Sequence, residues 1–195
     1  MSMFCFQCQE AAMGKGCTIQ GVCGKQPDTA KLQDLLVHTT KSIAFFSRKL
    51  RASGNVSSDV DYYLINSLFT TITNANFDND VIIERIREGL KLRDNLWQIT
   101  KEKGITIENT FPTYLKATSE LATTDEMIAF AETVGVLRTE NEDIRSLREL
   151  VIYGLKGLTA YAEHAFNLGK QNPEIYSFIE KALVEVDNPA NGADE

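Results

Sequence analysis

The stretch Met3-Phe-Cys-Phe-Gln-Cys8 opens a window that contains all four cysteines of this 195-residue chain. The window closes at Cys23, and the thiols follow the spacing C-x2-C-x8-C-x5-C. A single cysteine is often just a small buried hydrophobe, whereas four thiolates this close together are typical of a tetrahedral metal site or an iron–sulfur cluster. The stretch therefore predicts an irregular, metal-organised lobe over residues 1–27, with the remaining chain as its scaffold.

Disulfide pairing of these cysteines is disfavoured on two grounds. Residues 1–9 show no basic segment followed by an apolar one, so no export signal is predicted and the thiols are expected in a reducing cytoplasm. A chain of this length also has no need of covalent staples to hold a core.

Structural zinc and an iron–sulfur cluster both stay open from the spacing. Zinc sites often pair two C-x2-C knuckles, and only the first pair here has that spacing. Iron–sulfur ligands reach different corners of a cluster and tolerate less regular intervals. Glycines let backbone N–H groups approach sulfur closely, which favours the cluster over zinc. Those in or beside the window are Gly14, Gly16, Gly21 and Gly24.

The composition is that of a folded, acidic protein. Hydrophobic residues make up 43% of the chain, and the formal net charge is -7. Nucleic acids and anionic membrane surfaces require a basic face, so neither is expected as a partner. Apolar runs also fall short of the roughly 18 residues that a membrane span needs.

Apolar residues recur at three- and four-residue intervals beyond residue 27, which predicts an all-α fold. The expected helix starts are Asp28 as an N-cap, Ser57 or Ser58, Asn79, Thr123 in a capping box with Glu126, Asn141, and Asn172-Pro173. The helix from Asn79 is expected to bury Val81, Ile82, Ile86, Leu90, Leu92 and Trp97. The helix from Asn141 is expected to bury Ile144, Leu147, Leu150, Val151, Leu155, Leu158 and Tyr161. His38 is expected to be half-buried, and neither it nor His164 lies in a metal-binding spacing.

An internal repeat organises these helices. Residues 32–46 align without gaps on residues 147–161, and Tyr62 and Ile65 fall on Tyr176 and Ile179. The repeat predicts two related antiparallel bundles. The expected divisions are a three-helix bundle over 28–104, a second and incomplete bundle over 105–188, and a disordered tail over 189–195. The missing helix leaves an apolar face open, which predicts a homodimer.

Several long motifs resemble the start of the hybrid cluster protein (prismane, or hydroxylamine reductase) family. Those around the cysteines are Met3-Phe-Cys-Phe-Gln-Cys-Gln-Glu10, Gly16-Cys-Thr18 and Gly21-Val-Cys-Gly-Lys25. Others are Leu32-Gln-Asp-Leu-Leu36, Thr71-Ile-Thr-Asn-Ala-Asn-Phe77, Thr139-Glu-Asn-Glu-Asp-Ile-Arg-Ser-Leu-Arg-Glu-Leu150, Gly154-Leu-Lys-Gly157 and Ala160-Tyr-Ala-Glu-His-Ala165. The resemblance runs to about residue 182.

That resemblance implies a helical domain of two bundles whose leading cysteines bind a 4Fe-4S cubane. By resemblance, Cys5, Cys8, Cys17 and Cys23 carry the cluster, and their spacing is similar to that of anaerobe-type members. A 2Fe-2S cluster, as in facultative-type members, is the lesser alternative. The family reduces hydroxylamine and nitric oxide at a second, mixed cluster, whose ligands are expected to lie outside this chain.

The resulting prediction is an electron-transfer domain that lacks the catalytic cluster, so catalysis by this chain alone is not expected. Its expected partners are a redox donor protein or the remaining domains of the larger enzyme. A redox or oxygen sensor, in which loss of the cluster reshapes residues 1–27, and a zinc-held interaction module are the alternative functions.

Overall fold

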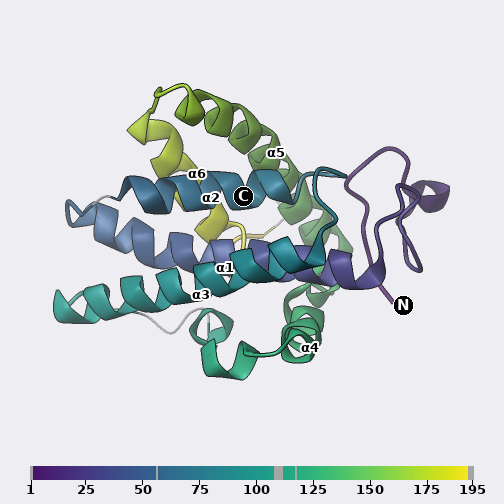
Figure 1. The fold of residues 1–195 in the computed structure, drawn as a ribbon, viewed down its shortest axis with the longest axis horizontal. Coiled ribbons are helices and arrows are strands. Elements are labelled where there is room, and N and C mark those ends of the chain that lie inside the picture. The colour runs from purple at the N-terminus through teal and green to yellow at the C-terminus, as the bar shows by residue number, and fades with distance from the viewer. Residues whose placement is uncertain (1, 56, 108–111, 117, 193–195) are drawn as a thin grey trace.

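The computed structural model describes residues 2–55, 57–107, 112–116 and 118–192. Within these ranges the regular elements are all helical, which confirms the all-α prediction (Figure 1). The α-helices are α1 Pro27–Ala52, α2 Ser58–Thr70, α3 Asn79–Glu102, α4 Thr124–Val134, α5 Glu142–Asn167 and α6 Pro173–Glu185. Short 3-10 turns are η1 Ala12–Gly14, η2 Pro112–Leu115, η3 Thr118–Leu121 and η4 Val136–Arg138.

Helix α1 is the centre of the packing, and α2, α3, α4 and α6 all contact it (Figure 1). Its side chains Leu32, Leu35 and Leu36 are fully buried in a cluster formed with apolar residues of α3 and α4. Complete burial of a leucine stabilises the fold by about 1.5–3 kcal/mol. The orientation of α1, and of the lobe that precedes it, is therefore fixed from several sides.

The sequence repeat is visible as two helical hairpins, α1–α2 and α5–α6. Helices α1 and α5 each have 26 residues, and α2 and α6 each have 13. The hairpins pack crosswise, because α1 lies against α6 while α2 lies against α5. These two contacts are equivalent under the repeat, so the hairpins are related by an approximate two-fold arrangement.

The predicted buried face of α5 is largely wrong. In α5, Leu147, Leu150 and Val151 are 43%, 66% and 44% exposed, although their repeat equivalents in α1 are fully buried. Helices α3 and α4 cover those positions of α1, and within the described residues α5 has no such cover. The side of α5 that is buried carries Ile152, Leu155, Lys156, Thr159, Ala162 and Glu163.

Among the other residues predicted to be buried, some are exposed and some are buried. Tyr161 and Val81 are also exposed, contrary to prediction, since each lies on the uncovered side of its helix. The predicted core residues Ile82, Ile86, Leu90 and Leu155 are buried as expected.

Most helix starts follow local capping chemistry. Thr123 and Glu126 form the predicted capping box of α4, Asn141 caps α5, and Asn172 caps α6. The prediction of Asp28 as an N-cap is wrong: Gln26 takes that position, because proline fits the first helical turn and α1 already begins at Pro27. Asp28 lies instead in the first turn, where a carboxylate complements the helix dipole.

The chain after α6 is anchored to α1, η2 and η4. Asp187 accepts hydrogen bonds from Lys41 at 3.0 Å and from Tyr114 at 2.9 Å, and it pairs with Arg138 of η4. The division into bundles at residues 104 and 188 stays a prediction, since α1 contacts helices of both. Residues 193–195 of the expected tail lie outside the described residues.

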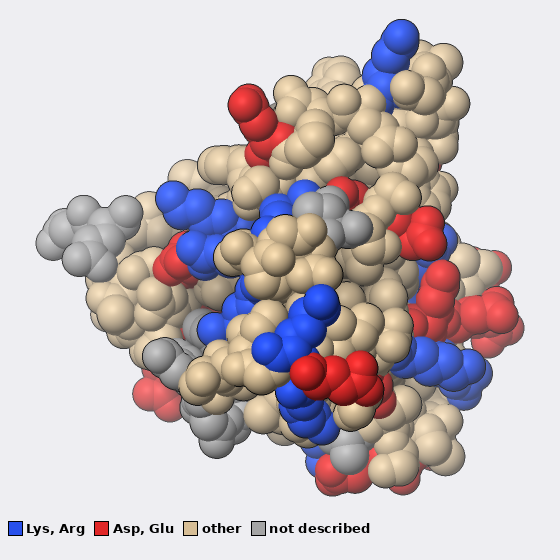
Figure 2. Space-filling view, turned by 90° about the vertical axis from the view of Figure 1, so that its left-hand side faces the viewer, with Lys and Arg blue, Asp and Glu red and all other residues tan. Residues whose placement is uncertain are grey.

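On the face opposite the cysteine lobe, basic and acidic side chains are interspersed over the described surface (Figure 2). No helix within the described ranges combines the length and the apolar character that a bilayer crossing requires.

Gly89 of α3 allows three helices to approach closely, which generates a stability prediction. A Cβ atom at Gly89 would lie 2.0 Å from the Tyr63 hydroxyl oxygen and 2.8 Å from Thr39 Cγ2. We expect Gly89→Ala to lower the free energy of unfolding by about 1–3 kcal/mol through overpacking. The matched control is Gly154→Ala in α5, where a Cβ meets open space, and alanine should stabilise that helix by up to about 1 kcal/mol. Urea denaturation measures both, and equal effects would contradict the packing described.

Candidate functional site

The lobe before α1 is held together by a single β-bridge between two of the four cysteines. The Cys5 backbone N–H donates to the Cys17 carbonyl at 3.1 Å, and the Cys17 N–H donates to the Cys5 carbonyl at 2.8 Å. Residues directly opposite in an antiparallel bridge have their Cβ atoms about 5 Å apart on one face. The bridge therefore places the side chains of Cys5 and Cys17 together. Cys17 is buried against Met3 and Ala30.

A tight turn positions the fourth cysteine. The Gly21 N–H donates to the Lys25 carbonyl at 2.8 Å, and the Gly24 N–H donates to the Gly21 carbonyl at 2.9 Å. A Cβ atom on Gly21 would lie 3.1 Å from Cys23 Sγ and 3.0 Å from Lys25 Cβ. The missing side chain of Gly21 is thus what allows the Cys23 sulfur and the Lys25 side chain to approach the Gly21 backbone.

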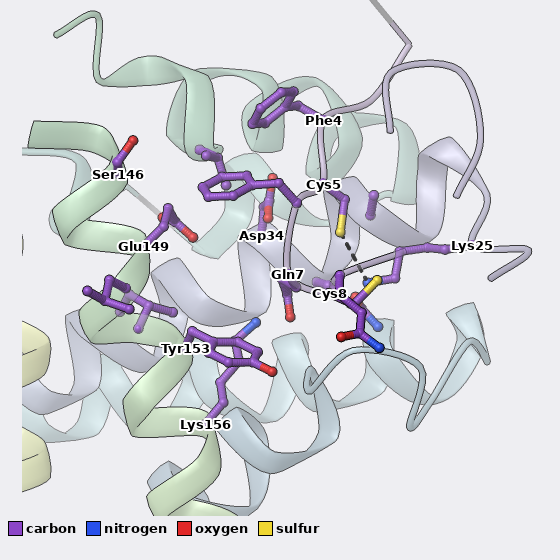
Figure 3. Close-up of a pocket in the computed structure, with 17 residues that line it drawn as sticks. Phe4, Cys5, Gln7, Cys8, Lys25, Asp34, Ser146, Glu149, Tyr153 and Lys156 are labelled. Carbon is purple, nitrogen blue, oxygen red and sulfur yellow. Dashed lines mark hydrogen bonds between the residues drawn. The ribbon is translucent and has the colours of Figure 1, made fainter. Parts of the chain in front are cut away.

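Lys25 joins this turn to the bridged cysteines. Its side chain is almost fully buried, and Nζ lies 4.0 Å from Cys5 Sγ (Figure 3). The ring of Phe77 covers the ammonium at 5.7 Å from its centroid. Helix α1 begins two residues later, at Pro27, and its N-terminus adds partial positive charge to the same region. The lobe therefore offers an electropositive environment to anionic sulfur.

The four predicted ligands are all free cysteines within this lobe. Cys5 and Cys8 line one pocket (Figure 3). Cys17 is buried beside Cys5, and Cys23 is exposed at the Gly21 turn. Within the described residues, no three His, Cys, Asp or Glu side chains are grouped to hold a metal ion. Ligation by all four cysteines stays a prediction. The donor chemistry, the space left by Gly21 and the buried Lys25 ammonium fit an anionic, cysteine-held group.

A cavity of about 570 Å³ lies between the lobe and α5. Phe4 and Phe6 from the lobe and Leu150 and Tyr153 from α5 give it apolar walls, as Figure 3 shows for the labelled residues. Its charged lining residues are Lys25, Asp34, Glu149 and Lys156. The cavity therefore joins the cysteines to two buried lysines and two half-buried carboxylates.

Burial drives Asp34 and Lys156 towards their neutral forms. It raises the pKa of Asp34 to about 7, and the nearby charge of Glu149 acts in the same direction. Burial also lowers the pKa of Lys156 to about 8, against the attraction of Asp34 and Glu149. The Lys156 ammonium donates to the Thr71 carbonyl at 3.2 Å. Both groups thus change protonation near neutral pH.

Sequence reasoning missed these charged residues, although the repeat contains a signal for them. Asp34 aligns with Glu149, and Lys41 aligns with Lys156. Charges on amphipathic helices usually face solvent, but here the crosswise hairpins bring the repeated charges inside. In the sequence, Lys25 is only the last residue of a cysteine motif.

The histidines do not join the site. The expectation that His38 is half-buried is wrong, because aromatic contacts with Tyr114 and Phe130 enclose the ring. Burial lowers the pKa of His38 to about 3, so the ring is neutral at physiological pH. His164 lies on the exposed side of α5, next to Phe69.

Comparison with known proteins gives consistent matches along the whole chain. The model of the Prismane/CO dehydrogenase family matches residues 3–192. Hydroxylamine reductase from Bacteroides thetaiotaomicron is 52% identical over 186 residues, which is 95% of this chain and 33% of that protein. Hydroxylamine reductases from Desulfitobacterium hafniense and Clostridium perfringens are 51% and 49% identical, each covering 100% of this chain and 35% of their own length. This chain therefore spans about a third of the length of these curated relatives.

The raised pKa of Asp34 makes the stability of the fold depend on pH. Between pH 3.8 and about 7 the unfolded carboxyl is ionised while the folded one keeps its proton, so the parent chain loses stability as the pH rises. Asparagine does not ionise. We therefore expect Asp34→Asn to gain stability over the parent progressively across this window, with the gain complete above about pH 7.

Urea denaturation of parent and variant at several pH values measures this gain. The exposed Asp59→Asn is the matched control and should show no comparable rise. A stability difference between Asp34→Asn and its parent that does not change with pH would contradict a carboxyl that keeps its proton in the folded state.

Proposed function

This chain belongs to the Prismane/CO dehydrogenase family, and we propose on that basis that its lobe holds a 4Fe-4S cluster for electron transfer. The proposed ligands are Cys5, Cys8, Cys17 and Cys23. The observation that carries the proposal is the buried Lys25 ammonium, which lies 4.0 Å from Cys5 Sγ in a lobe of four free cysteines. A buried cation of this kind fits an anionic group held by the same lobe.

Each part of the lobe has a role in this proposal. The bridge directs Cys5 and Cys17 to one face, the Gly21 turn presents Cys23, and the cavity wall presents Cys8. A bound cluster would supply one-electron transfer, while the chain's residues hold it, shield it with apolar side chains and balance its charge. Free thiolates persist under reducing conditions, so we place this function in the cytoplasm.

The reductase activity named for the relatives is assigned here only in part. This chain corresponds to about a third of those proteins, and we propose that it supplies the electron-transfer portion of hydroxylamine reduction. Its partners would then be a redox donor protein and the polypeptide that makes up the rest of such an enzyme. Reduction of hydroxylamine by this chain alone is not expected.

A redox or oxygen sensor is the second proposal, and the sparse secondary structure of the lobe favours it. One β-bridge and the short η1 turn are the regular structure among the described residues before α1. A bound cluster would therefore contribute much of the order of this segment, and its loss would reshape the surface. Partner binding that differs between loaded and empty protein would support this second function.

Anaerobically prepared protein tests the main proposal. We expect about four iron and four sulfide per chain, with a broad visible absorbance that bleaches on reduction. Cys8→Ser should lose most of this iron, because it removes one ligand. Met13→Ala is the matched control, since its side chain is exposed in the same lobe, and it should retain the parent content.

The metal analysis separates the proposals. Zinc near one per chain without sulfide would replace the cluster with a zinc-held interaction module. Parent protein without bound metal after anaerobic preparation would contradict both metal proposals.

We also propose that the exposed side of α5 pairs two copies of this chain. Leu147, Leu150 and Val151 form an apolar stripe that is 43–66% exposed, and exposed stripes of this kind drive association. Leu147→Glu, which lies outside the cavity, should therefore convert a dimer to a monomer, as measured by light scattering. Val81→Glu on α3, at a similarly exposed position, is the control. A parent protein that is monomeric at high concentration would contradict the dimer.

A further inference from the structure

Three lysines are at least nine-tenths buried in this acidic chain: Lys25, Lys41 and Lys156 are 1%, 8% and 3% exposed. A buried charge is costly unless polar or charged partners compensate it. Lys41 donates to the Asp187 carboxylate at 3.0 Å, and Lys156 donates to the Thr71 carbonyl at 3.2 Å. Both therefore have an oxygen partner.

Lys25 has a different environment. Its ammonium lies 4.0 Å from the Cys5 sulfur (Figure 3) and 5.7 Å from the centre of the Phe77 ring, and it also interacts electrostatically with Asp34 and Lys156. Among the described residues, no carboxylate forms an ion pair with its ammonium within 4.0 Å. Lys25 is thus the least exposed of the three lysines, and its ammonium lies within hydrogen-bond reach of a sulfur atom.

The neighbouring backbone and the Phe77 ring hold the Lys25 ammonium beside the Cys5 sulfur. The Gly21 turn clamps the backbone of Lys25, and the rigid α1 follows two residues later. The segment that carries Phe77 is tied to α1 on both sides, because Gln33 donates to the Asn76 carbonyl and Thr29 donates to Asn79, each at 2.8 Å. Phe77 therefore stays over Lys25, and water has little access to screen its charge.

We propose that Lys25 is the built-in counter-charge of the cysteine-held cluster and sets its reduction potential. The inference rests on the proposed cluster function. Reduction adds one electron, supplied by a donor protein, and makes the cluster one unit more negative. No bond to Lys25 forms or breaks and no proton moves. A fixed ammonium in a site of low dielectric stabilises the reduced state more than the oxidised one, so it raises the reduction potential.

Lys15 offers a matched comparison within the same lobe. Its side chain is exposed, so water and salt screen its charge. Lys25→Met and Lys15→Met make the same chemical change and remove the same charge. Lys25→Arg changes the shape of the side chain and keeps the charge.

The experiment is a redox titration of the anaerobically prepared full chain and these three variants, followed by visible absorbance. We expect Lys25→Met to lower the equilibrium constant for reduction at least tenfold, which is about 59 mV for one electron. Lys15→Met and Lys25→Arg should stay close to the parent. Iron and sulfide content, measured on each sample, shows whether the cluster is retained.

Each outcome decides the inference. A Lys25→Met protein that keeps its cluster at the parent potential would overturn it. If Lys25→Met cannot hold a cluster, the Lys25→Arg variant decides. A Lys25→Arg protein that holds the cluster at the parent potential supports the requirement for a positive charge, and a Lys25→Arg protein without a cluster overturns the inference. A parent chain without iron and sulfide would instead refute the proposed function itself, which the parent sample alone reveals.

Discussion

The burial of α1 on all sides is the constraint on which the rest of this structure depends. Its residues Leu32, Leu35 and Leu36 have no exposed surface and pack with α3 and α4, while other sides of the helix contact α2 and α6. A helix held this firmly gives its first turn a fixed direction. The cysteine lobe leads directly into that turn, and Lys25 lies two residues before it. The geometry of the candidate site is therefore a consequence of packing far along the helix.

The repeat accounts for the charged residues that line the cavity and for the exposed apolar stripe of α5. Asp34 of α1 and Lys156 of α5 interact electrostatically, and the repeat relates them to Glu149 and Lys41. Helices α3 and α4 follow the first hairpin and cover α1, whereas nothing equivalent covers α5 in the described chain. One sequence pattern thus produces a sealed core in one half and an open apolar surface in the other.

Local features of the fold could be predicted from the sequence because they depend on neighbouring residues. The capping box at Thr123 and the caps at Asn141 and Asn172 involve contacts within three positions. The buried side of α5 could not be predicted in this way. Periodicity indicates which residues share a stripe, but only the arrangement of other helices decides whether that stripe is covered, and Leu150 is exposed for that reason.

In the candidate site, too, some features depend on residues close in sequence and others depend on tertiary packing. The cysteines were identifiable because four thiols at such short spacing are typical of a metal or cluster site, although the structure leaves their joint ligation a prediction. Lys25 and Asp34 resemble ordinary surface charges in sequence, and only tertiary packing buries Lys25 and half-buries Asp34. The chain has a net charge of -7, and reduction would add one more negative charge at the proposed cluster. Distant surface lysines do not stabilise that charge, because water and salt screen them. A single cation placed beside the sulfurs and covered by an aromatic ring acts over a short distance without that screening, which is why its burial matters more than the overall charge.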